Sequence, residues 1–202
     1  MKTSPHRICI AIIIIVVTIM LAACGGGSTS TKLSGSPEDI LNRVLDEAKK
    51  SLPDDKPMPE SRVTEVTADT SQNAIGLSTD DFNKYVSSAS IATALIGTFP
   101  HEIGVIQAKD AASAATIKKL ISSDGGYNSL KWICVSPEES CVLESGSYVL
   151  LAASRADVVD AVVSAFTAAA GNVGERNVFF TSEKGASEGG PAAGGGISLA
   201  PL

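Results

Sequence analysis

The stretch GSYVLLAASRADVVDAVVSAF, residues 146–166, decides the fold that is predicted for this chain of 202 residues. Its residues from Tyr148 to Ala153 form a continuous apolar run that is typical of a strand. Ser154 and Asp157 then have the spacing of a helix start. An apolar stripe follows at helical spacing, comprising Val158, Val159, Val162, Val163 and Phe166. We therefore predict a strand followed by a helix that ends at Gly171.

Two more helices are predicted nearer the N-terminus. Ser36 and Pro37 suit the N-cap and the first helical position, and Asp39 stands three residues after the Ser, where it can bond back to the cap. Apolar residues then recur at helical spacing, so this helix is expected to end near Leu52. Asp110 caps the next helix. Its apolar stripe comprises Ala111, Ala114, Ile117, Leu120 and Ile121.

Short runs of β-branched and apolar residues predict the other strands. They lie at Val63–Thr67, Tyr85–Ala92 and Glu102–Ala108. Two further runs, Leu130–Val135 and Cys141–Glu144, favour a hairpin, although Ser136 and Pro137 could instead start one helical turn. The last strands are too close together for parallel crossovers. The expected fold is therefore α+β, an antiparallel sheet of about five strands with helices packed on one face.

Cys134 and Cys141 would lie on the two arms of that hairpin. Six residues separate them, so their side chains could face each other, and an oxidising exterior would favour a disulfide. Two buried free thiols are the alternative. A redox or metal role is less well supported, because the spacing of redox pairs is absent and a zinc site would need more than one His. We expect a bridge between the two thiols and no bound cofactor.

The first 23 residues have the pattern of a secretion signal. Lys2 and Arg7 form a short basic head, and an apolar run follows from Ile8 to Met20. A membrane-spanning helix needs about 20 apolar residues, whereas the apolar part of a secretory signal uses about 7 to 15. The run is therefore predicted to direct export and not to span a membrane.

The four residues Leu21, Ala22, Ala23 and Cys24 match a lipobox. Small side chains let the extended chain enter a signal peptidase, and only a thiol can carry the thioether-linked diacylglycerol. An ordinary secretion signal beside an unrelated Cys is the alternative, but a Gly-, Ser- and Thr-rich segment follows, as a tether would. We predict cleavage between Ala23 and Cys24 and a lipid on Cys24 that anchors the protein to the extracytoplasmic side of the cell membrane.

Composition limits the possible partners. Removal of residues 1–23 leaves 14 basic and 22 acidic residues, a net charge of −8, which argues against binding to nucleic acid or to anionic lipid headgroups. Residues 24–35 are expected to form a flexible tether and residues 36–171 a single α+β domain. Residues 172–202 are expected to be a disordered, low-complexity, Gly-rich tail, in which Asn177 to Thr181 could add an edge strand.

Several segments occur together with the lipobox. The first is an expected turn at Asp80, Asp81 and Phe82. The second is the strand from His101 to Ile106, which leads to Lys109 and Asp110, and the third is the strand from Gly146 to Leu151. With these segments, spread over roughly Ile40 to Ala170, the chain resembles a family of small bacterial lipoproteins of unknown function, found mostly in Gram-positive species. The segment between Tyr127 and Gly146 departs from the family pattern in its length and its two Cys. The resemblance implies a lipid anchor and an α+β fold, and it implies no known activity.

His101 is the candidate catalytic residue, because it is the sole His outside the predicted signal. A hydrolytic triad would use it as the base, with Ser154 or Ser147 as the nucleophile. No glycine-flanked strand, Ser and helix arrangement supports either Ser, and Ser154 is already expected to cap a helix. Glu102 is expected to pair with a Lys or Arg at the surface. Catalysis is therefore not the favoured interpretation.

The sequence favours a noncatalytic module that binds an envelope protein or a small ligand at the membrane. An exported hydrolase that uses His101 is the alternative. A transporter-associated substrate-binding lipoprotein is less well supported, because one domain without a second lobe lacks the cleft that such proteins close around a ligand.

Overall fold

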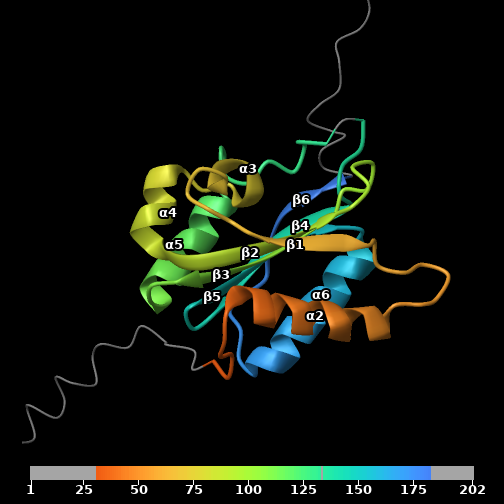
Figure 1. The fold of residues 1–202 in the computed structure, drawn as a ribbon, viewed down its shortest axis with the longest axis horizontal. Helices are drawn as coiled ribbons and strands as arrows, with labels where there is room; N and C mark the ends of the chain where they lie inside the picture. The colour runs from red at the N-terminus through yellow and green to blue at the C-terminus, as the bar shows by residue number, and fades with distance from the viewer. Residues whose placement is uncertain (1–30, 133, 183–202) are drawn as a thin grey trace, which may run out of the picture.

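The computed structural model describes residues 31–132 and 134–182, which are built around an open antiparallel sheet (Figure 1). Its strands lie in the order β1-β2-β3-β5-β4-β6, and neighbours pair antiparallel throughout. Their bounds are β1 Ser61–Glu65, β2 Val86–Ala94, β3 Glu102–Ala108, β4 Glu139–Ser145, β5 Tyr148–Ser154 and β6 Asn177–Thr181. The predicted α+β class and antiparallel sheet are confirmed, with six described strands in place of about five.

Helices cover both faces of the sheet (Figure 1). One face carries α2 Pro37–Ser51 and α6 Ala156–Ala170, and the other carries α3 Ser71–Ile75, α4 Thr79–Tyr85 and α5 Ala111–Ile121. The prediction that the helices pack on one face is therefore wrong. The physical reason lies in β5, in which every residue from Tyr148 to Ser154 is buried, so that both faces of the strand need cover.

The predicted start signals of α2 and α5 are confirmed. The Ser36 hydroxyl accepts a hydrogen bond from the Asp39 backbone nitrogen at 3.1 Å and donates to the Asp39 carboxylate at 2.7 Å. The Asp110 carboxylate accepts from the backbone nitrogen three residues later at 2.7 Å. The start of α6 differs, because its N-cap is Arg155 and no side chain bonds to the first turn from that position. The predicted role of Ser154 as a helix cap is therefore wrong.

Two segments differ from the prediction in type. Residues 80–82 are not a turn but part of α4, which is capped by Ser78, whose hydroxyl accepts from the Asp81 backbone nitrogen at 3.1 Å. The described residues of 130–135 form no strand, so neither the predicted hairpin nor the alternative helical turn after it is present among them. β4 forms a hairpin with β5 instead, through the predicted turn at Gly146, where φ is 58°.

The folded domain extends beyond the predicted bounds at both ends. Leu33 is buried in the core beneath α2 and α6, and the Lys32 backbone nitrogen donates to the Ala170 carbonyl at 2.9 Å. The last residues of the expected tether 24–35 thus belong to the domain. β6 pairs with β4, which confirms the expected edge strand and moves the end of the domain past the predicted residue 171.

The predicted signal at 1–23, the lipobox with Cys24, and the tail residues 183–202 lie outside the described residues. These features therefore remain predictions from the sequence. Among the described residues, no helix combines the length and the apolar character that a membrane crossing requires.

Candidate functional site

The two ends of the domain differ in what they carry. β5 ends at Ser154, opposite Glu139 at the start of β4, and α6 begins directly beyond this end of the sheet. The described chain enters the fold at the other end, where Lys32 contacts Ala170 in the last turn of α6. Because a helix of 15 residues is about 22 Å long, the two ends are separated by roughly that distance. We call the end near Ser154 the distal end.

A groove of about 440 Å³ opens at the distal end. It is lined by residues 55–60 of the loop between α2 and β1, by Leu95, Ile96 and Phe99 of the loop between β2 and β3, and by Arg155. The three apolar side chains are 52%, 59% and 49% exposed. We call this feature the distal groove. Neighbouring exposed apolar side chains of this size are typical of a surface that binds a partner.

Hydrogen bonds hold the walls of the distal groove in place. The Arg155 guanidinium donates to the carbonyls of Lys56 at 2.9 Å and Pro57 at 3.2 Å, which ties the first loop to the start of α6. The Leu95 backbone nitrogen donates to the Glu60 carbonyl at 2.9 Å, which joins the two loops. The groove is therefore a built feature of the fold, although its apolar lining remains open to solvent.

His101 and Ser154 meet beneath the distal end. His101 directly precedes β3 and Ser154 is the last residue of β5. His101 Nδ1 is 3.0 Å from Ser154 Oγ. Both side chains are buried, and His101 Nε2 has no hydrogen-bond partner among the described residues. Burial lowers the pKa of His101 to about 4, and the positive charges of Arg155 and Lys49 act in the same direction. The imidazole is therefore neutral at pH 7.

This pair contains two of the three groups that the hydrolase alternative requires. The third group, a carboxylate bonded to the second ring nitrogen, is absent from the described partners of His101. The other candidate nucleophile, Ser147, precedes the first residue of β5 and so lies at the opposite end of the strand from Ser154. The bond between His101 and Ser154 satisfies two buried polar atoms, which is sufficient reason for it in a folded core.

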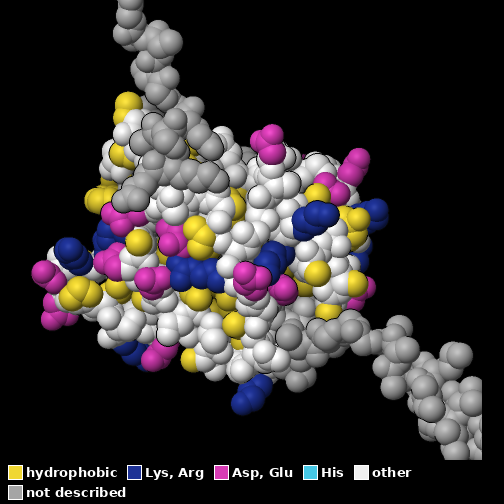
Figure 2. Space-filling view, turned by 180° about the vertical axis from the view of Figure 1, so that it is seen from behind, with side chains coloured by type: hydrophobic (Ala, Val, Ile, Leu, Met, Phe, Trp, Pro, Cys, Tyr) yellow, Lys and Arg dark blue, Asp and Glu magenta, His cyan; other side chains and the backbone are white. Residues whose placement is uncertain are grey.

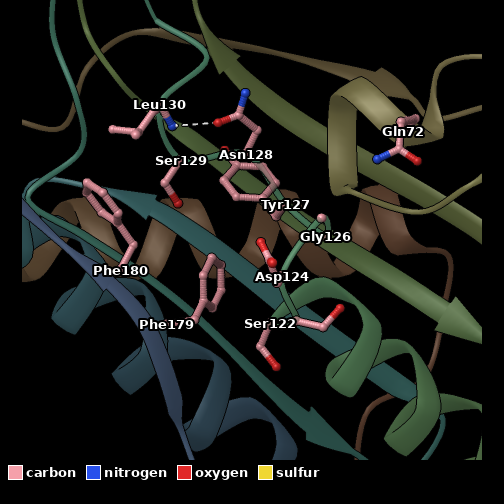
Figure 3. Close-up of a pocket in the computed structure, with 12 residues that line it drawn as sticks. Gln72, Ser122, Asp124, Gly126, Tyr127, Asn128, Ser129, Leu130, Phe179 and Phe180 are labelled. Carbon is pink, nitrogen blue, oxygen red and sulfur yellow. Dashed lines mark hydrogen bonds between the residues drawn. The ribbon is translucent and has the colours of Figure 1, made fainter. Parts of the chain in front are cut away.

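A second hollow of about 520 Å³ lies between the loop 122–130, β6 and α3 (Figure 3). We call it the Tyr127 pocket. Figure 3 shows Phe179 and Phe180 of β6 on one side and the loop residues Tyr127 and Asp124 on the other. The rings of Tyr127 and Phe179 meet edge to face, with centroids 6.1 Å apart. The lining is more polar than that of the distal groove, because serines and backbone groups of the loop contribute to it.

Glu102 forms a buried polar cluster behind the Tyr127 pocket. Its carboxylate accepts a hydrogen bond from the Tyr127 hydroxyl at 2.7 Å and forms an ion pair with Lys131. The Lys131 ammonium also lies 4.6 Å from the Tyr127 ring centroid and 5.3 Å from that of Trp132. Burial, followed by the charge of Glu102, raises the pKa of Tyr127 well above its usual value. Glu102 therefore pairs with a Lys, as predicted, but the carboxylate is buried and the Lys131 side chain is only partly exposed, so the pair is not at the open surface.

Cys134 and Cys141 are both free thiols, and they lie in different environments. Cys134 is exposed in the loop before β4, with a positive φ of 62°, whereas Cys141 is buried on β4, opposite Ala152 and Val178. Burial raises the pKa of Cys141 to about 11. The predicted disulfide is therefore not formed in this structure, and the hairpin that was expected to bring the two thiols face to face is absent from the described residues.

Positive and negative side chains are mixed on the face shown in Figure 2, where Lys and Arg lie among Asp and Glu. No group of three or more potential metal ligands occurs within residues 31–132 and 134–182. We take the distal groove and the Tyr127 pocket as the candidate sites, because each gathers aromatic and other apolar side chains from elements far apart in the sequence. Sequence analysis identified neither of them.

Comparisons with models of protein families, with curated proteins and with solved structures found no match to this chain.

Proposed function

We propose that this protein is an exported lipoprotein, anchored to the cell membrane through Cys24, and that its domain is a noncatalytic module that binds an envelope protein. The observation that carries the proposal is the distal groove, with its exposed Leu95, Ile96 and Phe99. The groove lies at the end of the domain opposite the entry of the chain from the proposed anchor. Such a groove could also accept a small apolar ligand, but its open shape and exposed rim suit a protein partner better.

The position of the groove supports a partner that does not belong to the anchoring bilayer. The proposed tether from Cys24 to Thr31 joins the domain beside Ala170. The groove lies beyond the N-terminal end of α6, about 22 Å away along that helix. A domain held by its lipid would therefore present the groove on the side away from its attachment point.

Photo-crosslinking in intact cells tests the binding role. A photoreactive phenylalanine analogue replaces Ile96 in the distal groove, and Val178, which is 43% exposed and lies outside both candidate sites, carries it in the matched control. We expect a reproducible envelope protein to be linked at position 96 and absent at position 178, as identified by mass spectrometry. The same set of abundant surface proteins at both positions would contradict the proposal.

Fractionation of cells tests the anchor. Cys24→Ala removes the thiol that the lipid requires. We therefore expect the variant to lose cleavage of the signal and to lose the stable membrane retention that two acyl chains provide. Cys134→Ala is the matched control, because it removes an exposed thiol elsewhere. Unchanged processing and retention of the Cys24 variant would disprove the anchor without affecting the groove.

The hydrolase alternative retains one supporting observation, the 3.0 Å contact between His101 and Ser154. A catalytic Ser would react with a fluorophosphonate probe, and Ser154→Ala would remove that reaction. We expect no labelling of Ser154 in the native protein, because its side chain is buried. Labelling that is lost in both Ser154→Ala and His101→Ala would favour the hydrolase.

A further inference from the structure

β1 forms one edge of the described sheet, with β2 beside it (Figure 1). The backbones of Glu60 and Val66, just before and just after β1, are hydrogen-bonded at 2.9 Å to β2 or to the residue that follows it. Because the backbone groups of an antiparallel strand point alternately to its two sides, Arg62 and Thr64 also face β2. The other residues of the strand direct their N–H and C=O groups away from the sheet, and they are Ser61, Val63 and Glu65. We call these outward backbone groups the β1 edge.

The β1 edge is uncovered. Within residues 31–132 and 134–182, no hydrogen bond satisfies its backbone groups. The Val63 side chain packs partly against the core beneath α2, whereas Glu65 is exposed. Outward residues of a strand recur at roughly 7 Å. A row of donors and acceptors with this repeat is matched by the backbone of another extended chain, so the β1 edge selects the conformation of an occupant.

The β1 edge is continuous with the distal groove. Glu60 lines the groove and directly precedes Ser61. Pro57 and Pro59 line it as well, and neither has an N–H that could pair with a strand. A neighbouring hollow of about 450 Å³ shares Glu60 with the groove and is also lined by Leu52, the C-cap of α2. An extended segment that pairs with β1 and continues past Ser61 therefore passes from backbone groups onto apolar side chains.

Most unpaired charges around this surface are negative. The acidic residues are Asp54, Asp55, Glu60 and Glu65, and the basic ones are Lys56 and Arg62. None of the six forms an ion pair with another described residue. Lys49 and Arg155 line the two hollows too, but each is paired with a neighbouring Asp. A basic segment complements this surface, whereas the same surface of a second copy would be repelled by it.

We infer that an extended segment of the partner adds to β1 as a further strand, carries Lys or Arg, and places large apolar side chains in the distal groove. The inference rests on the proposed function, since it gives the form in which an envelope protein would occupy that groove. Backbone pairing with the β1 edge supplies binding that is independent of sequence. The groove and the acidic side chains beside it select the sequence of the segment.

Hydrogen exchange of the purified full-length protein in detergent, followed by NMR, tests the free state of the β1 edge. The amides of Arg62 and Thr64 are bonded to β2, whereas those of the β1 edge are not. We therefore expect the amides of Ser61, Val63 and Glu65 to exchange about tenfold faster or more. Equal protection of all five amides would show that the edge is already covered, and would overturn the inference.

Random 12-residue peptides displayed on phage supply the probe for the bound state. We expect selection on the purified protein to enrich sequences that alternate apolar with other residues and carry Lys or Arg. A synthetic copy of the most enriched sequence should slow exchange at the β1 edge by about tenfold or more. N-methylation of every second residue in the peptide should abolish binding for one of the two alternating sets only, because a single set faces β1.

Ser61→Pro tests the same pairing from the side of the protein. It removes an outward N–H and takes no hydrogen bond from β2, a position at which edge strands tolerate Pro. Ser61→Ala keeps the N–H and is the matched control. We expect the selected peptide to bind the Ala variant as it binds the native protein and to bind the Pro variant about tenfold more weakly. Circular dichroism checks the fold of both variants, and the N-methylated peptides decide the matter if the Pro variant does not fold.

Other results overturn the inference. They are a library without enriched peptides, an enriched peptide that leaves the β1 edge unprotected, and equal binding to the folded Pro and Ala variants. A dimer in sedimentation, with the β1 edge protected, would identify a second copy as the occupant. The proposed function fails by a different result, namely no envelope protein linked at position 96 in cells. If a protein is linked there and a synthetic copy of its linked segment leaves the β1 edge unprotected, the function stands and the inference fails.

Discussion

His101 should make the domain less stable as the pH falls below about 6.5. Its pKa is about 4 in the folded protein and 6.5 as the ordinary value, because the side chain is buried near Arg155 and Lys49. Between these two values the unfolded chain binds a proton that the folded chain rejects, so acidification stabilises the unfolded state. Above pH 6.5 neither state is protonated, and the contribution of His101 to the pH dependence disappears.

The size of the effect follows from the two pKa values. Integration of the proton uptake from pH 7.5 to pH 4.5 gives a loss of about 2.5 kcal/mol in the free energy of unfolding. Urea unfolding, followed by circular dichroism, can measure this loss for the native sequence and for His101→Asn. The Asn side chain can keep a hydrogen bond to Ser154 Oγ but has no proton to gain, so the variant should lack this part of the pH dependence.

The comparison separates His101 from every other titrating group. Carboxyl groups such as Asp157, whose pKa is lowered, chiefly by the hydrogen bond from Arg155, are common to both proteins and cancel in the difference. The variant should be less stable at all pH values because it loses part of the ring. The test is therefore the difference in how the free energy of unfolding changes with pH in the two proteins. Parallel profiles for the two proteins from pH 7.5 to 4.5 would refute the burial argument.

Three further outcomes follow from the structure. Iodoacetamide should modify Cys134 but not the buried Cys141 in the native protein, and both in denaturant without reductant; no modification in denaturant would show that the two are bridged. Gly76→Ala should lower the free energy of unfolding by about 2 kcal/mol or more, because a Cβ there would lie 2.3 Å from a backbone nitrogen of the Tyr127 pocket loop and φ is +74°; an unchanged urea midpoint would contradict that contact. Glu102→Gln should cost about 2 kcal/mol, because the Lys131 ammonium, whose side chain is 14% exposed, keeps the Asn73 carbonyl but loses its charged partner; Lys131→Met in the same chain should recover part of this loss, and equal stability of the single and double variants would argue against the ion pair.

Local signals in the sequence account for the elements that were predicted correctly. Ser36 and Asp110 each bond to the first turn of the helix they precede, and β3 occupies the predicted range Glu102–Ala108. α4 was missed although the spacing of Ser78 and Asp81 carried the same kind of signal. In these cases the residues that determine the element are neighbours in sequence, so the pattern is visible without the fold.

Long-range features could not be read in the same way. The continuous apolar run of β5 is compatible with a strand that is buried on both faces. The run does not indicate which helices pack on each face. His101 and Ser154 are 53 residues apart in sequence, and their contact depends on the register between β3 and β5. At 130–135 a strand was predicted that the structure does not have. The described residues of this run have β-type side chains but lie in a loop, where Leu130 is exposed.

The distal groove escaped sequence analysis for a related reason. Leu95, Ile96 and Phe99 lie in a short loop without a period, and Met58 lies in another loop, so no pattern joins them until the hydrogen bond between Leu95 and Glu60 brings the loops together. The same fold that joins these loops separates them from the chain entry at Lys32 by the length of α6. If Cys24 carries the lipid, the domain has one end committed to the membrane and the other free to contact a partner.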